Sequence, residues 1–351
     1  MKRVTKLTFG LFASVLLLAL MAYLVGFDET VEAVGQLGLA AVLSLGAVKV
    51  VLLVCQAGAW TVLNRAIGHR VRFSTLLGAT TAGMAGNMLT PSTYLGGEPV
   101  KVLYAGRAAG LSYEQLAGTV LLMKYVEALS FVVFVMGATV LAVMDMGEVL
   151  FGGANIALGV SMLVVTAGAV VLLAVLWVSL ARGWLPLTVM AGLLARMGLF
   201  RRFFGRLRVR ARRVELQASR VFRQERRMVA PAFCLFLLTH AAMYLKPLLF
   251  FGLGWGVSLS AGELGLIFLT CQVLLAFQFT PGGVGTMDGG LFGMLAITGI
   301  AITHPQCAAY LLCMRFWDGL VIAAGAMLAT RLGVGLFAES KPATADRQRG
   351  R

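Results

Sequence analysis

The sequence NMLTPSTYLGGEP occupies residues 87–99 and interrupts an otherwise apolar part of the chain. A second interruption, TPGGVGTMD, occupies residues 280–288 of another apolar segment. Proline and glycine break a helix and leave backbone N–H and C=O groups unpaired, and lipid cannot satisfy them. Such backbone is tolerated at membrane depth only where protein buries it or where it lines a wet cavity. Both stretches therefore predict broken membrane segments beside a cavity.

The composition indicates a chain that lies mostly in lipid. Of its 351 residues, 59% are hydrophobic and only 13% are charged, and its mean hydropathy is +0.88. A soluble domain carries about 25% charged residues because its surface faces water. We therefore expect an all-α polytopic membrane protein, and a soluble globular domain is excluded.

The first apolar segment, Leu7–Val25, follows basic residues at positions 2, 3 and 6. A secretory signal peptide begins in the same way, but its apolar stretch has only about 7–15 residues and a small-residue cleavage site follows it. Here the stretch is about 19 residues long and no clean cleavage site follows. We expect an uncleaved transmembrane helix with its N-terminus in the cytoplasm.

The charges of the loops predict the path of the chain, because basic loops belong on the cytoplasmic side. The strongest marker is the segment 196–227, where twelve arginines stand against two acids, Glu215 and Glu225. We expect this segment and both termini in the cytoplasm, with the protein in the cytoplasmic (inner) membrane. Six full spans are expected: Leu7–Val25, Leu37–Trp60, Glu114–Val143, Ile156–Leu180, Met228–Phe251 and Ala308–Leu332.

The two interrupted segments are expected to be re-entrant helical hairpins. Phe73–Leu89 begins the first, and both of its flanks are basic, so both ends lie in the cytoplasm. The second, Glu263–Ile302, must begin and end outside for the tail to be cytoplasmic. Together these make about eight membrane segments, and two opposed broken segments suggest an inverted repeat. We expect one membrane domain over residues 1–336 and a polar, disordered cytoplasmic tail over residues 337–351.

An acid stands near the start of the helix that follows each break. Glu98 is expected as an N-cap before Pro99 at the first helical position, and Asp288 lies in the first turn after Thr286. One interpretation is that both acids cap helix ends and complement the helix dipole. An ionisable group at membrane depth costs roughly 2.5–3.5 kcal/mol, which a serine cap would avoid. We therefore favour a further role in binding protons or a cation, or in pairing with nearby bases.

Two half-helix N-termini that face a cavity form a site for an anion such as a lipid phosphate. The candidate basic residues in or near apolar segments are Lys101, Arg107, Lys124, Lys246 and Arg315. Lys124 could instead be neutralised by Glu127, three residues further on, and Lys246 could snorkel outward. Asp318 is a local partner for Arg315. His240 is expected to pack rather than to catalyse.

The basic segment 196–227 has two interpretations, a nucleic-acid patch or a surface for anionic lipid headgroups. The second is simpler in a membrane protein, so we expect membrane lipids and no nucleic acid as partners. The sequence holds no Walker loop, zinc motif, nucleophile elbow or Rossmann fingerprint, and its cysteines lack zinc-ligand spacing. We therefore expect no cofactor and no metal site.

These motifs resemble those of a known family, the lysylphosphatidylglycerol synthase transmembrane region, also called the flippase-like domain family of UPF0104-type integral membrane proteins. The resemblance covers nearly the whole chain. In the first half it rests on Asn87, Pro91, Gly96, Gly97, Glu98 and Lys101. In the second half it rests on Pro281, Gly282, Gly283, Gly285, Asp288 and Arg315. Two positions depart from the family pattern, Asp288 in place of Glu and Lys101 in place of Arg, and both keep the charge.

The resemblance implies a membrane domain that moves or presents amphipathic lipids between leaflets. We predict a transporter for an anionic lipid of the phospholipid or polyprenyl-phosphate type. In this prediction Glu98 and Asp288 are titratable gates, Lys101 and Arg315 are anion partners, and the Gly-Pro breaks are hinges.

Two other functions stay open at this point. One is an intramembrane transferase for a lipid-linked substrate, with Glu98 or Asp288 as general base. The other is a non-catalytic scaffold that recruits lipid-modifying enzymes through the basic segment. In some relatives the domain is joined to an aminoacyltransferase or glycosyltransferase. About fifteen residues follow Leu336, so we expect any such enzyme to be a separate polypeptide, without a fused synthase domain.

Overall fold

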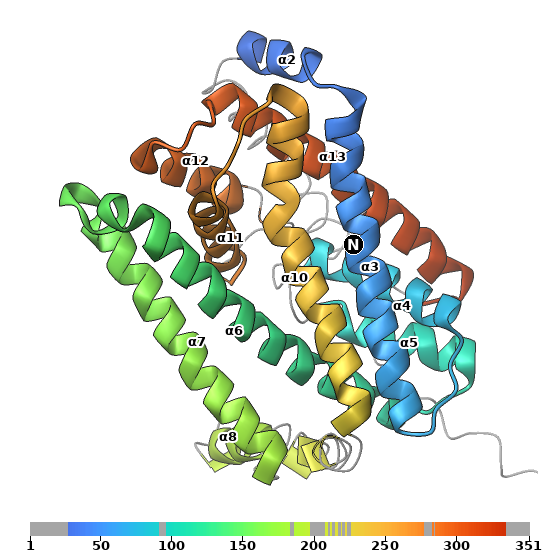
Figure 1. The fold of residues 1–351 in the computed structure, drawn as a ribbon. Helices are drawn as coiled ribbons and strands as arrows, with labels where there is room; N and C mark the ends of the chain where they lie inside the picture. Colours follow the sequence, from blue (N-terminus) through green and yellow to red (C-terminus); the bar gives the residue numbers. More distant parts are fainter. Residues whose placement is uncertain are drawn as a thin grey trace, which may run out of the picture.

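The computed structural model describes residues 27–90, 96–182, 186–196, 226–276, 283 and 285–334, with residues 208, 209, 211, 212, 215, 216, 219 and 222 of the basic segment. Within this part every regular element is a helix (Figure 1), so the predicted all-α class is confirmed. The expected first span Leu7–Val25, the tail, and residues 91–95, 280–282 and 284 of the breaks lie outside the described residues. Three predicted site residues, Pro91, Pro281 and Gly282, are among them.

Five described helices are long and apolar enough to cross a membrane. They are α3 (Leu39–Ala66), α6 (Tyr113–Phe151), α7 (Ile156–Arg182), α10 (Arg226–Trp255) and α13 (His304–Arg331). Each overlaps one of the expected full spans. The 28 residues of α3 reach about 42 Å at 1.5 Å per residue, more than the hydrocarbon core of a bilayer. The chain is therefore a multi-pass membrane protein.

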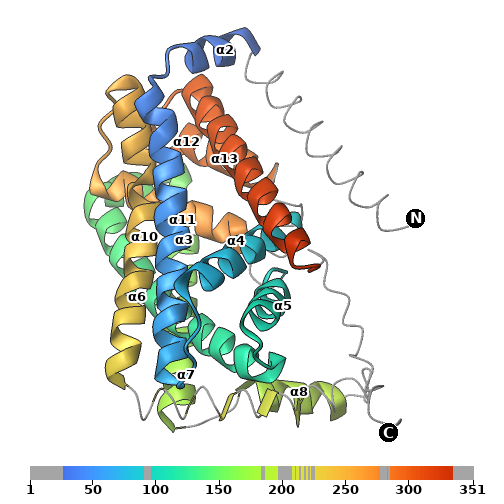
Figure 2. The ribbon, with the colours of Figure 1, turned by 90° about the vertical axis from the view of Figure 1, so that its right-hand side faces the viewer.

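Each break is flanked by two short helices. The first break lies between α4 (Phe73–Leu89) and α5 (Glu98–Ala109), and the second lies between α11 (Ala261–Ala276) and α12 (Thr286–Thr298). In Figure 2, α5 lies in the lower part of the bundle and α12 in its upper part, while α4 and α11 lie at middle height between them. The re-entrant course of both pairs, and the total of eight membrane segments, remain predictions. The remaining described elements are α2 (Phe27–Gly35), the short 3-10 helix η1 (Gly153–Asn155) and α8 (Pro186–Arg196).

The start of α5 differs from the prediction by one residue. Its N-cap is Gly97, and Glu98 is already helical, whereas the sequence placed Glu98 at the N-cap. The backbone N–H of Gly97 donates to Asn87 Oδ1 at 2.6 Å, which ties the N-cap to the last turn of α4. Pro99 still falls in the first turn, where its missing N–H breaks no helical hydrogen bond. The carboxylate of Glu98 is thus not needed as a cap.

In each half of the chain, the short helix before the break packs against a long span of the other half. α4 packs against α13, and α11 packs against α6, while α3 and α10 lie side by side and run in opposite directions (Figure 1). Both crossings depend on a glycine. A Cβ at Gly325 would stand 2.7 Å from the carbonyl oxygen of Thr81, and a Cβ at Gly265 would stand 2.7 Å from that of Ala138. Backbone therefore meets backbone where each short helix crosses a span, which is how small residues serve helix packing in membranes.

We predict that Gly325→Ala destabilises the bundle. Its Cβ would lie 2.5 Å from Ala85 Cβ and 2.7 Å from Thr81 O, so α13 must move away from α4. Overpacking of this kind costs about 1–3 kcal/mol. Thermal unfolding of the purified protein in detergent should show a Tm several degrees lower. Gly319→Ala is the matched control on the same helix, because nothing lies within 4 Å of its Cβ position. Equal Tm values for the two variants would contradict the close crossing.

Candidate functional site

The bundle encloses a cavity of about 400 Å³. Residues from α3, α4, α5, α6, α10, α11, α12 and α13 line it, so both halves of the chain and all four short helices contribute. Its walls combine apolar side chains, such as Leu52, Ile267 and Phe268, with a small number of charged groups. A cavity of this size with a few convergent polar groups is the usual form of a small-molecule or lipid binding site.

The first break supplies one of two ion clusters at this cavity. Glu98 Oε1 lies 3.1 Å from Lys101 Nζ and 3.1 Å from Lys124 Nζ. Lys124 Nζ also lies 2.9 Å from Glu127 Oε2. Two bases and two acids make the cluster neutral, which is what a low-dielectric environment requires of buried ions. The second oxygen of Glu98, Oε2, is buried and accepts no hydrogen bond from the described part of the chain.

Close backbone contact between α4 and α5 places Lys101 in the cavity wall. A Cβ at Gly97 would stand 1.8 Å from Gly83 O, and a Cβ at Gly83 would stand 2.3 Å from Lys101 Cγ. Because neither position carries a side chain, the stem of Lys101 lies flat against α4. Lys101 is consequently only 2% exposed. Gly97 of the first break and Gly83 of α4 are thus packing requirements of the ion cluster.

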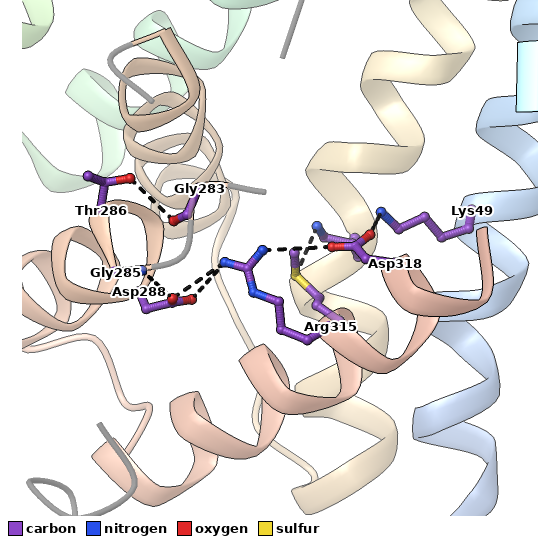
Figure 3. Close-up of polar contacts among 9 residues, drawn as sticks. Lys49, Gly283, Gly285, Thr286, Asp288, Arg315 and Asp318 are labelled. Carbon is purple, nitrogen blue, oxygen red and sulfur yellow. Dashed lines mark hydrogen bonds and ion pairs between the residues drawn. The ribbon is translucent and has the colours of Figure 1, made fainter. Parts of the chain in front are cut away.

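The second break supplies the other cluster (Figure 3). Arg315 Nη2 donates to Asp288 Oδ1 at 3.1 Å and to Oδ2 at 3.4 Å. Asp288 Oδ2 also accepts from the backbone N–H of Gly285 at 2.8 Å. Arg315 Nη1 lies 3.9 Å from Asp318 Oδ2, and Asp318 pairs with Lys49 of α3. Two bases again meet two acids, and the fully buried Asp288 is held from two sides.

The two acids at the breaks therefore act differently at their helix ends. Asp288 caps α12 by accepting from the backbone N–H of Gly285, and it also pairs with Arg315. Gly285 has a φ of +88°, a conformation that glycine adopts without strain. Glu98 makes no cap hydrogen bond, and its Oε1 pairs with Lys101 and Lys124. Capping alone accounts for neither carboxylate.

Nine of the twelve predicted site residues are described, and they lie at the cavity or in the breaks beside it. Asn87, Lys101 and Arg315 line the cavity. Gly96, Gly97, Glu98, Gly283, Gly285 and Asp288 lie in or beside the two breaks that border it. Among the described residues, no group of His, Cys, Asp or Glu is arranged to hold a metal ion.

Three other residues considered in the sequence analysis, Lys246, Arg107 and His240, differ in their position relative to the cavity. Lys246 lines the cavity, so it does not snorkel outward. Arg107 lies away from the cavity and donates to the carbonyl oxygens of Leu332 and Gly333 at the end of α13, which removes it from the site. His240 is buried with its ring centroid 5.5 Å from that of Phe131, as a packed histidine, although it also borders the cavity.

One cavity residue, Lys49, was missed by the sequence analysis. It stands in the middle of the apolar helix α3, and its amino group pairs with Asp318, 269 residues further along the chain. A lone ionisable residue inside a membrane span is itself a signal of a functional or paired group. That signal was present in the sequence and would have identified Lys49.

We predict that breaking the Asp288–Arg315 pair from one side is more harmful than removing both charges. Arg315→Gln leaves the buried Asp288 without its base, and Asp288→Asn leaves Arg315 with its longer contact to Asp318. Loss of one partner of a buried ion pair costs about 3–5 kcal/mol. The double variant removes both ions, so its Tm in detergent should lie above that of either single variant. Arg107→Gln, outside the cavity, is the control and should leave this comparison unchanged. Additive losses in the double variant would show that the two side chains are not coupled.

Comparison with known proteins places the chain among integral membrane proteins. Residues 7–326 match the model of a family described as the lysylphosphatidylglycerol synthase TM region. A relative described as a UPF0104 membrane protein, from Methanothermobacter thermautotrophicus, is 23% identical over 308 residues, which cover 82% of this chain and 84% of the relative. The family match includes both breaks, both ion clusters and the cavity between them. The chain belongs to the lysylphosphatidylglycerol synthase TM region family.

Proposed function

We propose that this protein is a membrane transporter that moves or presents an anionic amphipathic lipid between the two leaflets. The observation that carries the proposal is the cavity, which both halves and both broken segments build inside the bundle. Broken helices around a central site are the usual construction of secondary transporters, where they let a site open to one side at a time.

The order of elements supports an alternating mechanism. A span, two short helices and a span (α3 to α6) recur as α10 to α13, and the paired spans α3 and α10 run in opposite directions (Figure 1). In the proposal these halves are an inverted repeat, and α4–α5 and α11–α12 are re-entrant hairpins that enter from opposite faces. Both termini then lie in the cytoplasm, on the side of the basic segment.

The charges at the cavity support an anionic cargo. Its lining holds five bases, Lys49, Lys101, Lys124, Lys246 and Arg315, and two acids, Glu127 and Asp318. Glu98 and Asp288 pair with these bases from beside the cavity, so one positive charge is in excess. A cavity with an excess of one charge sign concentrates the opposite sign within it. Apolar walls beside these bases fit the acyl or prenyl part of an amphipathic molecule.

The acids of the two breaks are the gates in this proposal. Glu98 and Asp288 hold Lys101 and Arg315 in ion pairs. Protonation of either acid would break its ion pair and let the helices that the pair joins move, so lipid movement would be coupled to protons. The same carboxylates would be the general bases of a transferase, and the basic segment would carry a scaffold function. We keep both as outcomes of the test below.

We expect Glu98→Gln to slow lipid movement at least tenfold, because the amide cannot neutralise Lys101 and Lys124. The measurement is leaflet-to-leaflet movement of labelled phospholipids and polyprenyl phosphates in liposomes that contain the purified protein. Glu148→Gln is the matched control, since Glu148 is exposed near the end of α6 and should behave as wild type.

Three results would contradict parts of this proposal. Wild-type movement by a folded Glu98→Gln, Asp288→Asn double variant would remove the gates from the mechanism while the transporter stands. Chemical conversion of a lipid by the purified protein without leaflet exchange would replace the transporter by the transferase. Loss of the protein's function in cells on deletion of residues 206–223, with normal leaflet exchange in liposomes, would favour the scaffold.

A further inference from the structure

The charged side chains around the cavity do not balance. In the first cluster Lys101 and Lys124 meet Glu98 and Glu127, and this cluster is neutral. In the second cluster Lys49 and Arg315 meet Asp288 and Asp318, and this cluster is also neutral. One cavity base belongs to neither cluster, and it is Lys246 of α10.

Lys246 has only weak partners in the described part of the chain. Its Nζ lies 3.3 Å from Met314 Sδ and 5.5 Å from the ring centroid of Tyr310. A thioether is a weak acceptor, and an aromatic face attracts a cation without neutralising it. No carboxylate oxygen of the described residues lies within 4.0 Å of this amino group, so its charge stays uncompensated in a membrane protein's interior.

Lys246 lies at the same depth as the second cluster. It stands nine residues before the end of α10, Lys49 stands ten residues after the start of α3, and Arg315 stands eleven residues after the start of α13. These helix ends lie at the same end of the bundle (Figure 1). At 1.5 Å per residue the three bases are about 14–17 Å from that end. The unpaired charge therefore lies deep in the bundle.

We propose that Lys246 is the anchor for the charged headgroup, and that the headgroup is a singly charged phosphodiester. This inference rests on the proposed function, because it assigns the cargo of the same cavity. Five bases and four acids leave one positive charge, which one phosphodiester neutralises. A phosphomonoester carries about −1.5 to −2 at pH 7 and would leave negative charge in the low-dielectric cavity. Lys101 and Arg315, predicted as the anion partners, are already neutralised by their acids.

The position of the weak partners gives the anchor a simple way to exchange them. A phosphodiester oxygen that enters beside α10 replaces Met314 Sδ as the acceptor for Lys246 Nζ, and a charged acceptor binds an ammonium group more strongly than a thioether does. No ion pair has to break for this step. The two neutral clusters are then free to act as gates rather than as binding groups.

The test is equilibrium binding to the purified full-length protein in neutral detergent. The probes are dihexanoyl phosphatidylglycerol as the phosphodiester lipid, dihexanoyl phosphatidic acid as the phosphomonoester lipid, and inorganic phosphate as a free anion. We expect the phosphodiester lipid to bind at least tenfold tighter than the phosphomonoester lipid. Inorganic phosphate should not compete at concentrations that far exceed the Kd of the lipid.

The matched variants are Lys246→Met, which removes the charge and keeps the length, and Lys246→Arg, which keeps the charge. We expect Lys246→Met to weaken phosphodiester binding at least tenfold and Lys246→Arg to stay within about threefold of wild type. The Tm of Lys246→Met without lipid should equal or exceed that of wild type, because an uncompensated charge has been removed. Undiminished lipid binding by Lys246→Met, or a lower Tm that marks Lys246 as structural, overturns the anchor.

Other results are also decisive. Tighter binding of the phosphomonoester lipid overturns the charge argument, and competition by inorganic phosphate at the Kd of the lipid assigns the site to a soluble anion. The binding experiment and the transport assay can fail independently of each other. Lys246-dependent binding without leaflet exchange would leave the anchor standing and end the transporter proposal. Leaflet exchange that is unchanged in Lys246→Met would leave the transporter proposal standing and overturn the anchor.

Discussion

An ion inside a membrane protein must be neutralised by a neighbour, and this constraint organises the centre of the molecule. The two breaks place Glu98 and Asp288 inside the bundle, and each is held by bases from its own half. Lys49 and Asp318 extend the second cluster to α3. The helices that carry these groups are thereby fixed relative to one another, and the cavity keeps its shape because its walls are joined by ion pairs.

Glycine makes this arrangement sterically accessible. The short helices can reach the ion clusters only if their backbones approach their neighbours closely. Gly83 and Gly97 allow this approach between α4 and α5, Gly325 allows it between α13 and α4, and Gly265 allows it between α11 and α6. Larger residues there would separate α4 from α5 or move a short helix away from its span. Close packing and charge neutralisation are therefore one problem in this fold, since a shift of about 1 Å at a crossing changes the distance between ions that must stay paired.

The sequence predicted much of this because its signals are local. Run length and hydropathy located five described spans, and proline with glycine located both breaks. The acids beside the breaks followed from their position. Contacts between distant helices have no local signal, so the pairing of Lys49 with Asp318 and of Lys124 with Glu98 came from the structure alone. The pairing of Arg315 with Asp288 and the isolation of Lys246 also came from the structure, and they moved the proposed anchor to a residue that the sequence left open.

The most direct test of the account asks whether the cavity is a wet, positively charged space inside the membrane. Cys271 lines it, whereas Cys234 is exposed on the outer surface of α10. Two single-cysteine proteins in liposomes would be treated with a negatively charged methanethiosulfonate reagent, and the rate of modification measured. The account predicts that Cys271 reacts, that phosphatidylglycerol slows the reaction, and that Cys234, which faces lipid, does not react. A Cys271 as inert as Cys234 would contradict it.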